Sequence, residues 1–158
     1  MDEDSAVNGN EFTKQIDEYA KQNNSEVLLV SAKIESEISQ ISDENEKKEF
    51  LESLGLAETG LKRVIRKGYE ILNYINFFTA GEKELRAWTI VKGSLAPTAA
   101  GAIHSDMEKG FIRAETISYN DYIDFKGEVG SKEKGKLRLE GKEYVVQDGD
   151  VMHFLFNV

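Results

Sequence analysis

The side chains best suited to chemistry are few. His104 and His153 are the only histidines, and the chain contains no cysteine. His104 lies two residues before Asp106, a spacing that allows a base and an orienting carboxylate, and Asp148-Gly149-Asp150 offers two carboxylates to a cation. Zinc, however, needs three or four ligands, and no third histidine is available. We therefore interpret His104 as the end of a helix and Asp148-Gly149-Asp150 as a turn, with no metal site.

The motif for binding a nucleoside triphosphate is absent. No G-x-x-x-x-G-K-[ST] occurs, and neither a switch region nor a Mg²⁺-binding aspartate after a strand can be identified. Phosphoryl transfer depends on these groups to position and neutralise the phosphates, so we expect no catalytic residue in this chain. Two acidic runs could be read as catalytic carboxylate pairs, but we interpret them as solvated helix faces: Glu35/Glu37 and Asp43/Glu44/Glu46.

Basic side chains gather in two places and suggest contact with phosphates. The candidates for RNA contact are Arg63, Arg66, Lys67, Lys132, Lys134, Lys136, Arg138 and Lys142. Tyr119 and Tyr122 could stack on unpaired bases. The alternative is a solubilising surface, because glutamates are interleaved with the second group of lysines. A further aromatic group is interpreted as core, because alternating strands bury one face: Phe77, Phe78, Trp88, Phe154 and Phe156.

Composition excludes several classes of protein. Without cysteine there can be no disulfide or thiolate metal site, as is typical of a reducing cytoplasm, and no apolar run approaches the roughly 20 residues of a membrane span. We therefore expect a cytoplasmic protein with no membrane partner. The net charge of -9 is divided unevenly: residues 1–60 carry 15 acidic and 5 basic side chains, and residues 61–158 carry 14 acidic and 15 basic. This asymmetry indicates two units with different partners.

Helical periodicity dominates the first part of the chain. Phe12, Ile16 and Tyr19 recur at helical spacing and predict a helix that ends near Asn23-Asn24. Three further helices are predicted from these apolar positions: Ile34, Ile38 and Ile41; Phe50, Leu51 and Leu54; Leu61, Val64, Ile65, Gly68 and Leu72. We expect Ser42 or Asp43 to cap the second of these helices and Thr59 to cap the third.

An unbroken apolar run, VLLV at residues 27–30, interrupts these helices. Such a run is typical of a strand buried on both faces of a parallel sheet, yet no neighbouring strand is predicted. We therefore expect a strand separated from its sheet, and its open edges favour self-association with a second copy. Ser31-Ala32-Lys33 follows its carboxyl end, where ligands bind in open α/β sheets.

The second part of the chain reads as short strands. Residues 74–79 and 85–90 predict one hairpin, and residues 137–139 and 144–146 predict a second. Pro97 opens a predicted helix, residues 111–118 and 151–158 are further strands, and residues 120–125 form a helical turn. In strand 111–118, we expect Ile112, Ala114 and Thr116 to share one face. Two hairpins around one crossing helix indicate a β-grasp fold.

Long stretches of the chain resemble a known family. They are FFTAGEKELRAWTIVKGSLAPTAAGAIHSDMEKGFIRAETIS and LRLEGKEYVVQDGDVMHFLFNV, preceded by VLLVSAKIE and LGLAETGLKRVIRKGYEILNYI. These stretches resemble the C-terminal part of YchF-type Obg-like ATPases, P-loop proteins of the Obg family. The resemblance implies an α+β chain: residues 1–33 as an α/β remnant of the P-loop nucleotide-binding domain, 34–73 as a helical connector, and 74–158 as a β-grasp (ubiquitin-like) TGS domain.

The resemblance also implies a function and a partial nucleotide site. Met1 and Glu3 match the tail of the family's base-recognition motif, and Ser31, Ala32 and Lys33 match a later loop that lies against the base. The full-length parent is expected to use ATP (or GTP) and Mg²⁺ as a hydrolase, whereas this chain holds no cofactor. The TGS part is expected to bind the ribosome or structured RNA and to couple that contact to nucleotide hydrolysis. The alternative is a β-grasp protein–protein interaction module with no RNA binding.

Overall fold

A computed structural model describes Ser5 and residues 9–81 and 84–157, so the predicted site residues Met1 and Glu3 lie outside the described residues. The chain divides into two compact units, residues 1–68 (unit 1) and residues 69–158 (unit 2). Each is described by itself. No helix among the described residues is long and apolar enough to span a membrane.

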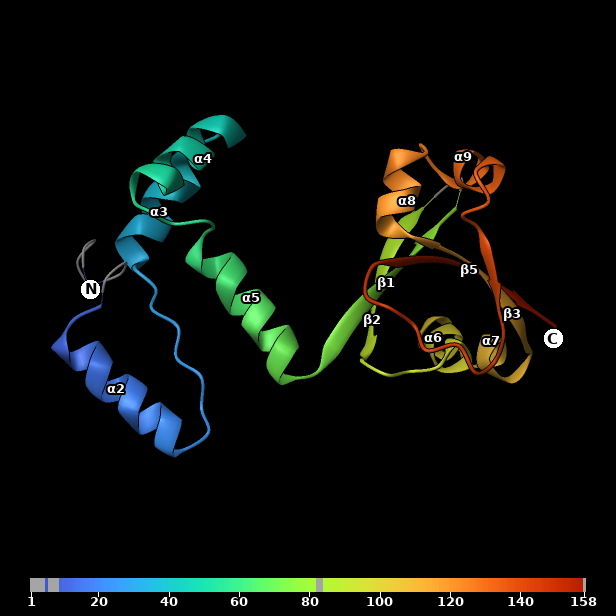
Figure 1. Cartoon of the computed structure of the whole chain (residues 1–158), viewed down its shortest axis with the longest axis horizontal. Helices are drawn as coiled ribbons and strands as arrows, with labels where there is room; N and C mark the ends of the chain where they lie inside the picture. Colours follow the sequence, from blue (N-terminus) through green and yellow to red (C-terminus); the bar gives the residue numbers. More distant parts are fainter. Residues whose placement is uncertain (1–4, 6–8, 82–83, 158) are drawn as a thin grey trace. The chain divides into compact units, whose positions relative to one another are not determined.

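Unit 1 is helical where it is described. Its helices are α2 (Glu11–Gln22), α3 (Ala32–Gln40), α4 (Glu44–Ser53) and α5 (Gly60–Ile71), the last of which continues into unit 2 (Figure 1). Side chains of Asn10, Ser31 and Asp43 accept hydrogen bonds from the first backbone N–H groups of α2, α3 and α4, which have no partner within their helices. The predicted caps at Asp43 and Thr59 are confirmed, since the Thr59 hydroxyl accepts from Lys62 N at 3.2 Å.

A small apolar cluster holds α3 and α4 together. Ile34, Ile38 and Leu51 are buried in it, and Phe50 and Leu54 pack against them. The apolar stripes of α2 and α5 are exposed instead. Those exposed side chains are Phe12, Ile16, Tyr19, Leu61, Val64 and Ile65.

The predicted strand at residues 27–30 is wrong. Residues 25–31 connect α2 to α3 without regular secondary structure, and none of them joins the sheet of unit 2. A strand needs a neighbour to accept its backbone hydrogen bonds, and the described residues supply none here. Self-association through this segment stays a prediction.

Unit 2 is built on a mixed five-stranded sheet formed by the described residues. Its strands are β1 (Tyr74–Ala80), β2 (Leu85–Val91), β3 (Phe111–Ser118), β4 (Arg138–Glu140) and β5 (Asp150–Phe156). The order is β2-β1-β5-β3-β4, with β1 and β5 parallel and the other neighbours antiparallel. The predicted α+β class and β-grasp arrangement are confirmed.

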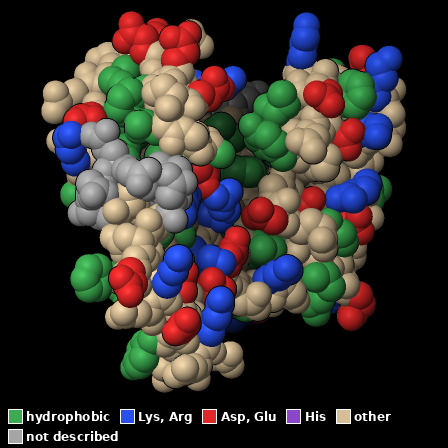
Figure 2. Space-filling view, turned by 60° about the vertical axis from the view of Figure 1, so that its left-hand side comes forward, with side chains coloured by type: hydrophobic (Ala, Val, Ile, Leu, Met, Phe, Trp, Pro, Cys, Tyr) green, Lys and Arg blue, Asp and Glu red, His purple; other side chains and the backbone are tan. Residues whose placement is uncertain are grey.

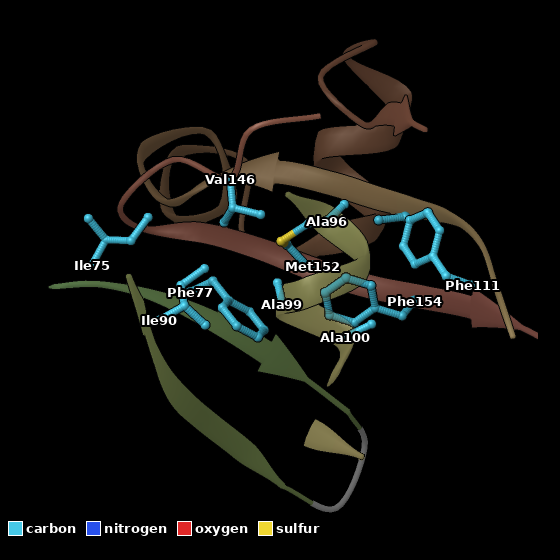
Figure 3. Packing of buried hydrophobic residues seen from close by; sticks show 11 residues of the cluster. Ile75, Phe77, Ile90, Ala96, Ala99, Ala100, Phe111, Val146, Met152 and Phe154 are labelled. Atoms are coloured by element: carbon cyan, nitrogen blue, oxygen red, sulfur yellow. The ribbon is translucent and has the colours of Figure 1, made fainter. Parts of the chain in front are cut away.

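One helix fills the core side of this sheet. In α6 (Ala96–Ile103), the buried alanines Ala96, Ala99 and Ala100 lie over the aromatic residues of β1 and β5 (Figure 3). Phe77 and Phe154 meet edge to face with ring centroids 5.7 Å apart. Small side chains on the helix thus let the large rings of the strands fill the space between the two layers. The predicted core is confirmed for Phe77 and Phe154, whereas Phe156 is exposed.

Three short helices complete unit 2. They are α7 (Ser105–Lys109), α8 (Tyr119–Asp124) and α9 (Glu128–Glu133). Because Phe77 faces α6, its neighbour Phe78 faces the opposite side of the sheet, where it contacts Tyr119 of α8. The helical turn predicted at residues 120–125 is confirmed.

Two predictions about strands are wrong. Residues 144–146 form no hairpin with β4, because they hydrogen-bond to the segment before α6: Ala96 N donates to Tyr144 O, and Val146 N donates to Ser94 O. In β3, an irregularity between Phe111 and Arg113 shifts the register, so Phe111 faces the core with Ala114 while Ile112 is exposed.

Candidate functional site

The segment Ser31-Ala32-Lys33 is the start of helix α3. Ser31 is buried, and its hydroxyl accepts a hydrogen bond from Ile34 N at 3.4 Å. Ala32 and Lys33 are exposed, and the Lys33 ammonium lies 3.8 Å from the Glu37 carboxylate. The backbone at this point is therefore fixed by a helix cap, and the exposed surface belongs to Ala32 and Lys33.

Glu35, on the same helix, caps helix α5. Its carboxylate accepts hydrogen bonds from Gly60 N at 2.7 Å and Leu61 N at 3.2 Å. The first turn of α5 contains no acidic residue of its own, so Glu35 supplies the negative charge that a helix N-terminus favours. A Cβ on residue 60 would lie 2.9 Å from this carboxylate and 2.9 Å from Val30 Cγ1, so the close approach requires glycine. The interpretation of Glu35 as a merely solvated helix face is wrong.

Two further contacts join α5 to the segment before α3. Arg63 Nη1 donates to Leu29 O at 3.4 Å, and Lys67 Nζ lies 3.4 Å from Glu26 Oε1. We call these two contacts, together with the Glu35 cap, the α5 clamp. The remaining predicted cation of the helix, Arg66, forms an ion pair with Glu58. The basic residues of α5 therefore contact unit 1 itself, and their proposed role in RNA contact stays a prediction.

A second basic group, the lysine-rich segment (residues 126–138), lies in unit 2 and contains five basic and two acidic side chains. Lys132 and Lys134 are exposed and form no ion pair with any described residue. The same holds for Lys142 in the turn after β4. Lys136 lies 3.2 Å from Asp121 of α8, and the Ser118 hydroxyl together with Lys136 holds the pKa of Asp121 below its usual value. On the face seen in Figure 2, basic and acidic side chains are interspersed.

Arg138 is held by contacts with three neighbouring side chains. Its Nη2 lies 3.3 Å from Asp150 Oδ1 and 3.0 Å from the Tyr144 hydroxyl, and its Nε lies 3.4 Å from Glu140. Asp150 is buried and accepts two more hydrogen bonds, from the Tyr144 hydroxyl at 2.7 Å and from Gln147 N at 2.9 Å. Burial, and then the hydrogen bond to Asp150, raise the pKa of Tyr144. This network holds the turn before β5 and leaves Arg138 less available than the lysines.

The histidine and aspartate motifs have the structural roles predicted for them. His104 ends α6 and begins α7, and its Nδ1 accepts from Asp106 N at 3.2 Å. Gly149 has φ of +83°, and Asp148 Oδ1 accepts from Asn76 N at 2.8 Å. No group of three His, Cys, Asp or Glu side chains that could hold a metal ion occurs in the part of the chain that the structure describes.

Comparison with known proteins places this geometry in a family. The family model YchF-GTPase_C, described as a protein of unknown function (DUF933), matches residues 74–157. The curated "Ribosome-binding ATPase YchF" of Haemophilus ducreyi is 57% identical over 158 residues, which are 100% of this chain and 43% of that protein. The protein of the same name from Bacillus subtilis is 57% identical over 99% of this chain and 43% of its own length. The chain thus spans about two fifths of the length of these relatives.

Solved structures agree with the fold. The Schizosaccharomyces pombe YchF GTPase superposes with a TM-score of 0.79 at 36% identity, over 96% of this chain and 40% of that chain. A GTP-binding protein from Pyrococcus horikoshii superposes with a TM-score of 0.63 at 19% identity, over 96% of this chain and 44% of that chain. The second likeness concerns the fold alone.

Proposed function

Since the chain belongs to the YchF family, we propose that it is the C-terminal part of a ribosome-binding ATPase. Residues 1–33 are the end of the P-loop nucleotide-binding domain, 34–73 are its helical connection, and 74–158 are a TGS domain. The TGS domain contacts the ribosome or structured RNA. The rest of the parent binds ATP (or GTP) and Mg²⁺, because the phosphate-binding motif is absent from these 158 residues.

The exposed apolar stripes of unit 1 support a missing partner domain. In α2, Phe12, Ile16 and Tyr19 lie on one side of the helix, and Phe12 is 73% exposed. Amphipathic helices normally bury such a stripe, and contiguous exposed apolar surface marks an interaction site. More than half of the length of the curated relatives lies outside the matched part, which is enough chain to cover these helices.

The α5 clamp supports coupling between the nucleotide and the TGS domain. Ser31, Ala32 and Lys33 (with Met1 and Glu3) lie against the base in this proposal, and Glu35 follows them within the first turn of α3. A shift of that turn on nucleotide exchange moves the carboxylate that caps α5. Coupling of this kind requires an element that both sites bias, and α5 is that element.

The observation that carries the ribosome contact is the exposure of lysines without ion-pair partners. Lys132, Lys134 and Lys142 project from unit 2 and form no ion pair with a described residue. Such side chains can neutralise phosphates at little cost, because no existing ion pair has to be broken. Arg63, Arg66 and Lys67 have contacts within unit 1, so we assign them a secondary role.

Ribosome co-sedimentation over a salt series tests this proposal. The variant Lys132→Glu/Lys134→Glu/Lys142→Glu should bind more weakly and with a salt slope lower by roughly 2 to 3, since each phosphate contact contributes about 0.7–0.9. The matched control reverses three exposed lysines of unit 1, Lys14, Lys21 and Lys48, with the same change in net charge. Equal binding by the two variants refutes the lysine contact.

The alternative, a protein-binding β-grasp module without RNA, has one observation in its favour. Leu85, Val91 and Leu139 are exposed side chains of the edge strands β2 and β4. Ribosome binding that is insensitive to salt and to the lysine variant would support this alternative. In either case we expect the chain alone to release no more phosphate from ATP than a buffer blank.

A further inference from the structure

A hollow lies on the side of the sheet opposite α6, where β1 meets α8. It has a volume of about 410 Å³ and is lined by Asn76, Phe78, Tyr119, Asn120 and Asp148, among others. We propose that this hollow binds one unpaired RNA base, with guanine preferred over adenine. The inference rests on the proposed RNA contact of unit 2 and names the chemical group recognised there.

The aromatic residues of the hollow form a stacking surface. Tyr119 is 51% exposed, and its ring lies 6.0 Å from that of half-buried Phe78, at an angle of 40°. Phe78, on the sheet, is therefore a neighbour of the tyrosine ring, and about half of Tyr119 remains accessible. The backbone of Gly149 lies beside the base of this side chain, since an added Cβ would lie 3.4 Å from Tyr119 Cβ. A supported, half-exposed aromatic ring is a stacking platform for a base.

The polar groups of the hollow offer one hydrogen-bond acceptor and one donor to the edge of a base. Asp148 Oδ1 is occupied by Asn76 N at 2.8 Å, while its Oδ2 accepts no hydrogen bond from the described residues. Asn76 Oδ1 accepts from the Thr89 hydroxyl at 2.8 Å, which leaves the amide nitrogen as its donor. A carboxylate oxygen accepts from guanine N1–H and N2–H, and an amide donor suits guanine O6. Uracil offers the same two groups through N3–H and O4, whereas adenine has no ring N–H to offer the carboxylate.

The lysine-rich segment is attached beside this hollow. The Ser131 hydroxyl of α9 donates to Asp121 O of α8 at 3.2 Å, and Lys136 Nζ lies 3.2 Å from the Asp121 carboxylate. Tyr119 begins the same α8, so a strand whose base stacks on Tyr119 can place its phosphates near Lys132 and Lys134. This combination of cations and an aromatic platform favours single-stranded nucleic acid over a peptide.

A larger groove of about 840 Å³ near Trp88 lacks such a platform. The Arg86 guanidinium lies 4.6 Å from the centre of the Trp88 ring and covers one of its faces. The charge of Arg86 is in turn balanced by Glu84, 3.8 Å away.

Fluorescence anisotropy with two short labelled RNAs tests the inference. Both are A-rich and single-stranded, with a central guanine in one and a central adenine in the other. We expect tighter binding of the guanine probe and a loss of roughly five- to a hundred-fold in Tyr119→Ala, the range for base–aromatic stacking. Tyr119→Phe should bind as the wild type does. Tyr19→Ala, which removes an exposed tyrosine of unit 1, is the matched control.

Asp148→Asn tests base recognition separately from stacking. The asparagine Oδ1 can still accept from Asn76 N, but a donor replaces the free carboxylate oxygen, so the preference for guanine over adenine should disappear. Circular dichroism of each variant verifies folding, and Tyr119→Leu replaces Tyr119→Ala if the smaller side chain unfolds the domain.

Three outcomes overturn the inference. If the lysine triple variant loses ribosome binding while Tyr119→Ala and Asp148→Asn bind both RNAs normally, the base site is wrong and the proposed function stands. If Tyr119→Ala loses ribosome binding but not RNA binding, the hollow contacts protein. If the wild type binds neither RNA at low salt, the base site fails whether or not the chain sediments with ribosomes.

Discussion

Removal of the Glu35 carboxylate should weaken unit 1 and leave unit 2 unchanged. In the variant Glu35→Ala, Gly60 N and Leu61 N lose acceptors at 2.7 and 3.2 Å. Loss of an N-cap acceptor costs about 0.5–2 kcal/mol, and loss of a negative charge at a helix N-terminus costs about 0.3–1 kcal/mol. Because water can replace part of both interactions, we expect Glu35→Ala to lower the free energy of unfolding of unit 1 by about 1–2 kcal/mol. Glu35→Gln, which retains one acceptor, should lose about half as much.

Two spectroscopic probes report the two units in one urea titration. Trp88 is the only tryptophan and lies in unit 2, whereas far-UV circular dichroism also follows the helices of unit 1. Glu35→Ala should therefore lower the midpoint of the dichroism transition and leave the Trp88 fluorescence transition in place.

Glu37→Ala is the matched control for this prediction. Glu37 lies on the same helix, and its contact with Lys33, at 3.8 Å, joins two exposed side chains, a kind of pair worth about 0–1 kcal/mol. If Glu35→Ala and Glu37→Ala destabilise unit 1 equally, Glu35 does not cap α5 in solution and the α5 clamp loses its main contact.

Three further changes test other parts of the structure. Gly110→Ala should destabilise unit 2 strongly in urea titration, because an added Cβ would lie 1.9 Å from the backbone oxygen of Asn157, which follows β5. An unchanged midpoint would contradict this packing. Tyr144 has a raised pKa in the folded state, so its contribution to stability is complete below the ordinary tyrosine pKa of about 10 and is lost as pH rises toward the folded pKa. The difference in urea midpoint between wild type and Tyr144→Phe should therefore shrink above about pH 10, and a constant difference would refute the role of its bond to Asp150. Gly68→Ala should stabilise α5 by roughly 1 kcal/mol in the same titration, because a Cβ there meets nothing within 4 Å; no change or a loss would contradict this.

Local patterns predicted most of the elements in unit 2. Strand β3 matches its predicted bounds, and Pro97 opens α6 as expected, because alternation and proline act over a few residues. The second predicted hairpin failed for a different reason. Residues 144–146 take their backbone partners from Ser94 and Ala96, about fifty residues earlier in the chain, and no local pattern encodes that choice.

The role of Glu35 in the candidate site also depends on a partner that is distant in sequence. Glu35 could not be told from Glu37 by local pattern, because both lie on an acidic helix and the partner of Glu35 is the N-terminus of α5, 25 residues away. A signal was present at the other end: the first turn of α5 has glycine at its start and no acidic residue, which leaves a helix N-terminus in need of an external charge. For VLLV at residues 27–30, the apolar composition predicted a strand. The described residues offer this segment no neighbouring strand, and it has no regular secondary structure.

Helix α5 has contacts within each of the two units, so the coupling that we propose would run through it. The α5 clamp holds its first turns, while in its last turn the Tyr69 hydroxyl lies 3.3 Å from Thr89 Oγ1 of β2. Only Leu72 and Asn73 separate the end of the helix from β1, and Asn73 O accepts from Lys92 N at 2.7 Å. Gly68, a helix-disfavouring glycine in the interior of α5, lies between these two sets of contacts. If coupling runs through α5, Gly68→Ala should strengthen the effect of nucleotide on ribosome affinity in the full-length parent while leaving affinity without nucleotide unchanged. Equal effects of nucleotide in both proteins would mean that another element carries the coupling.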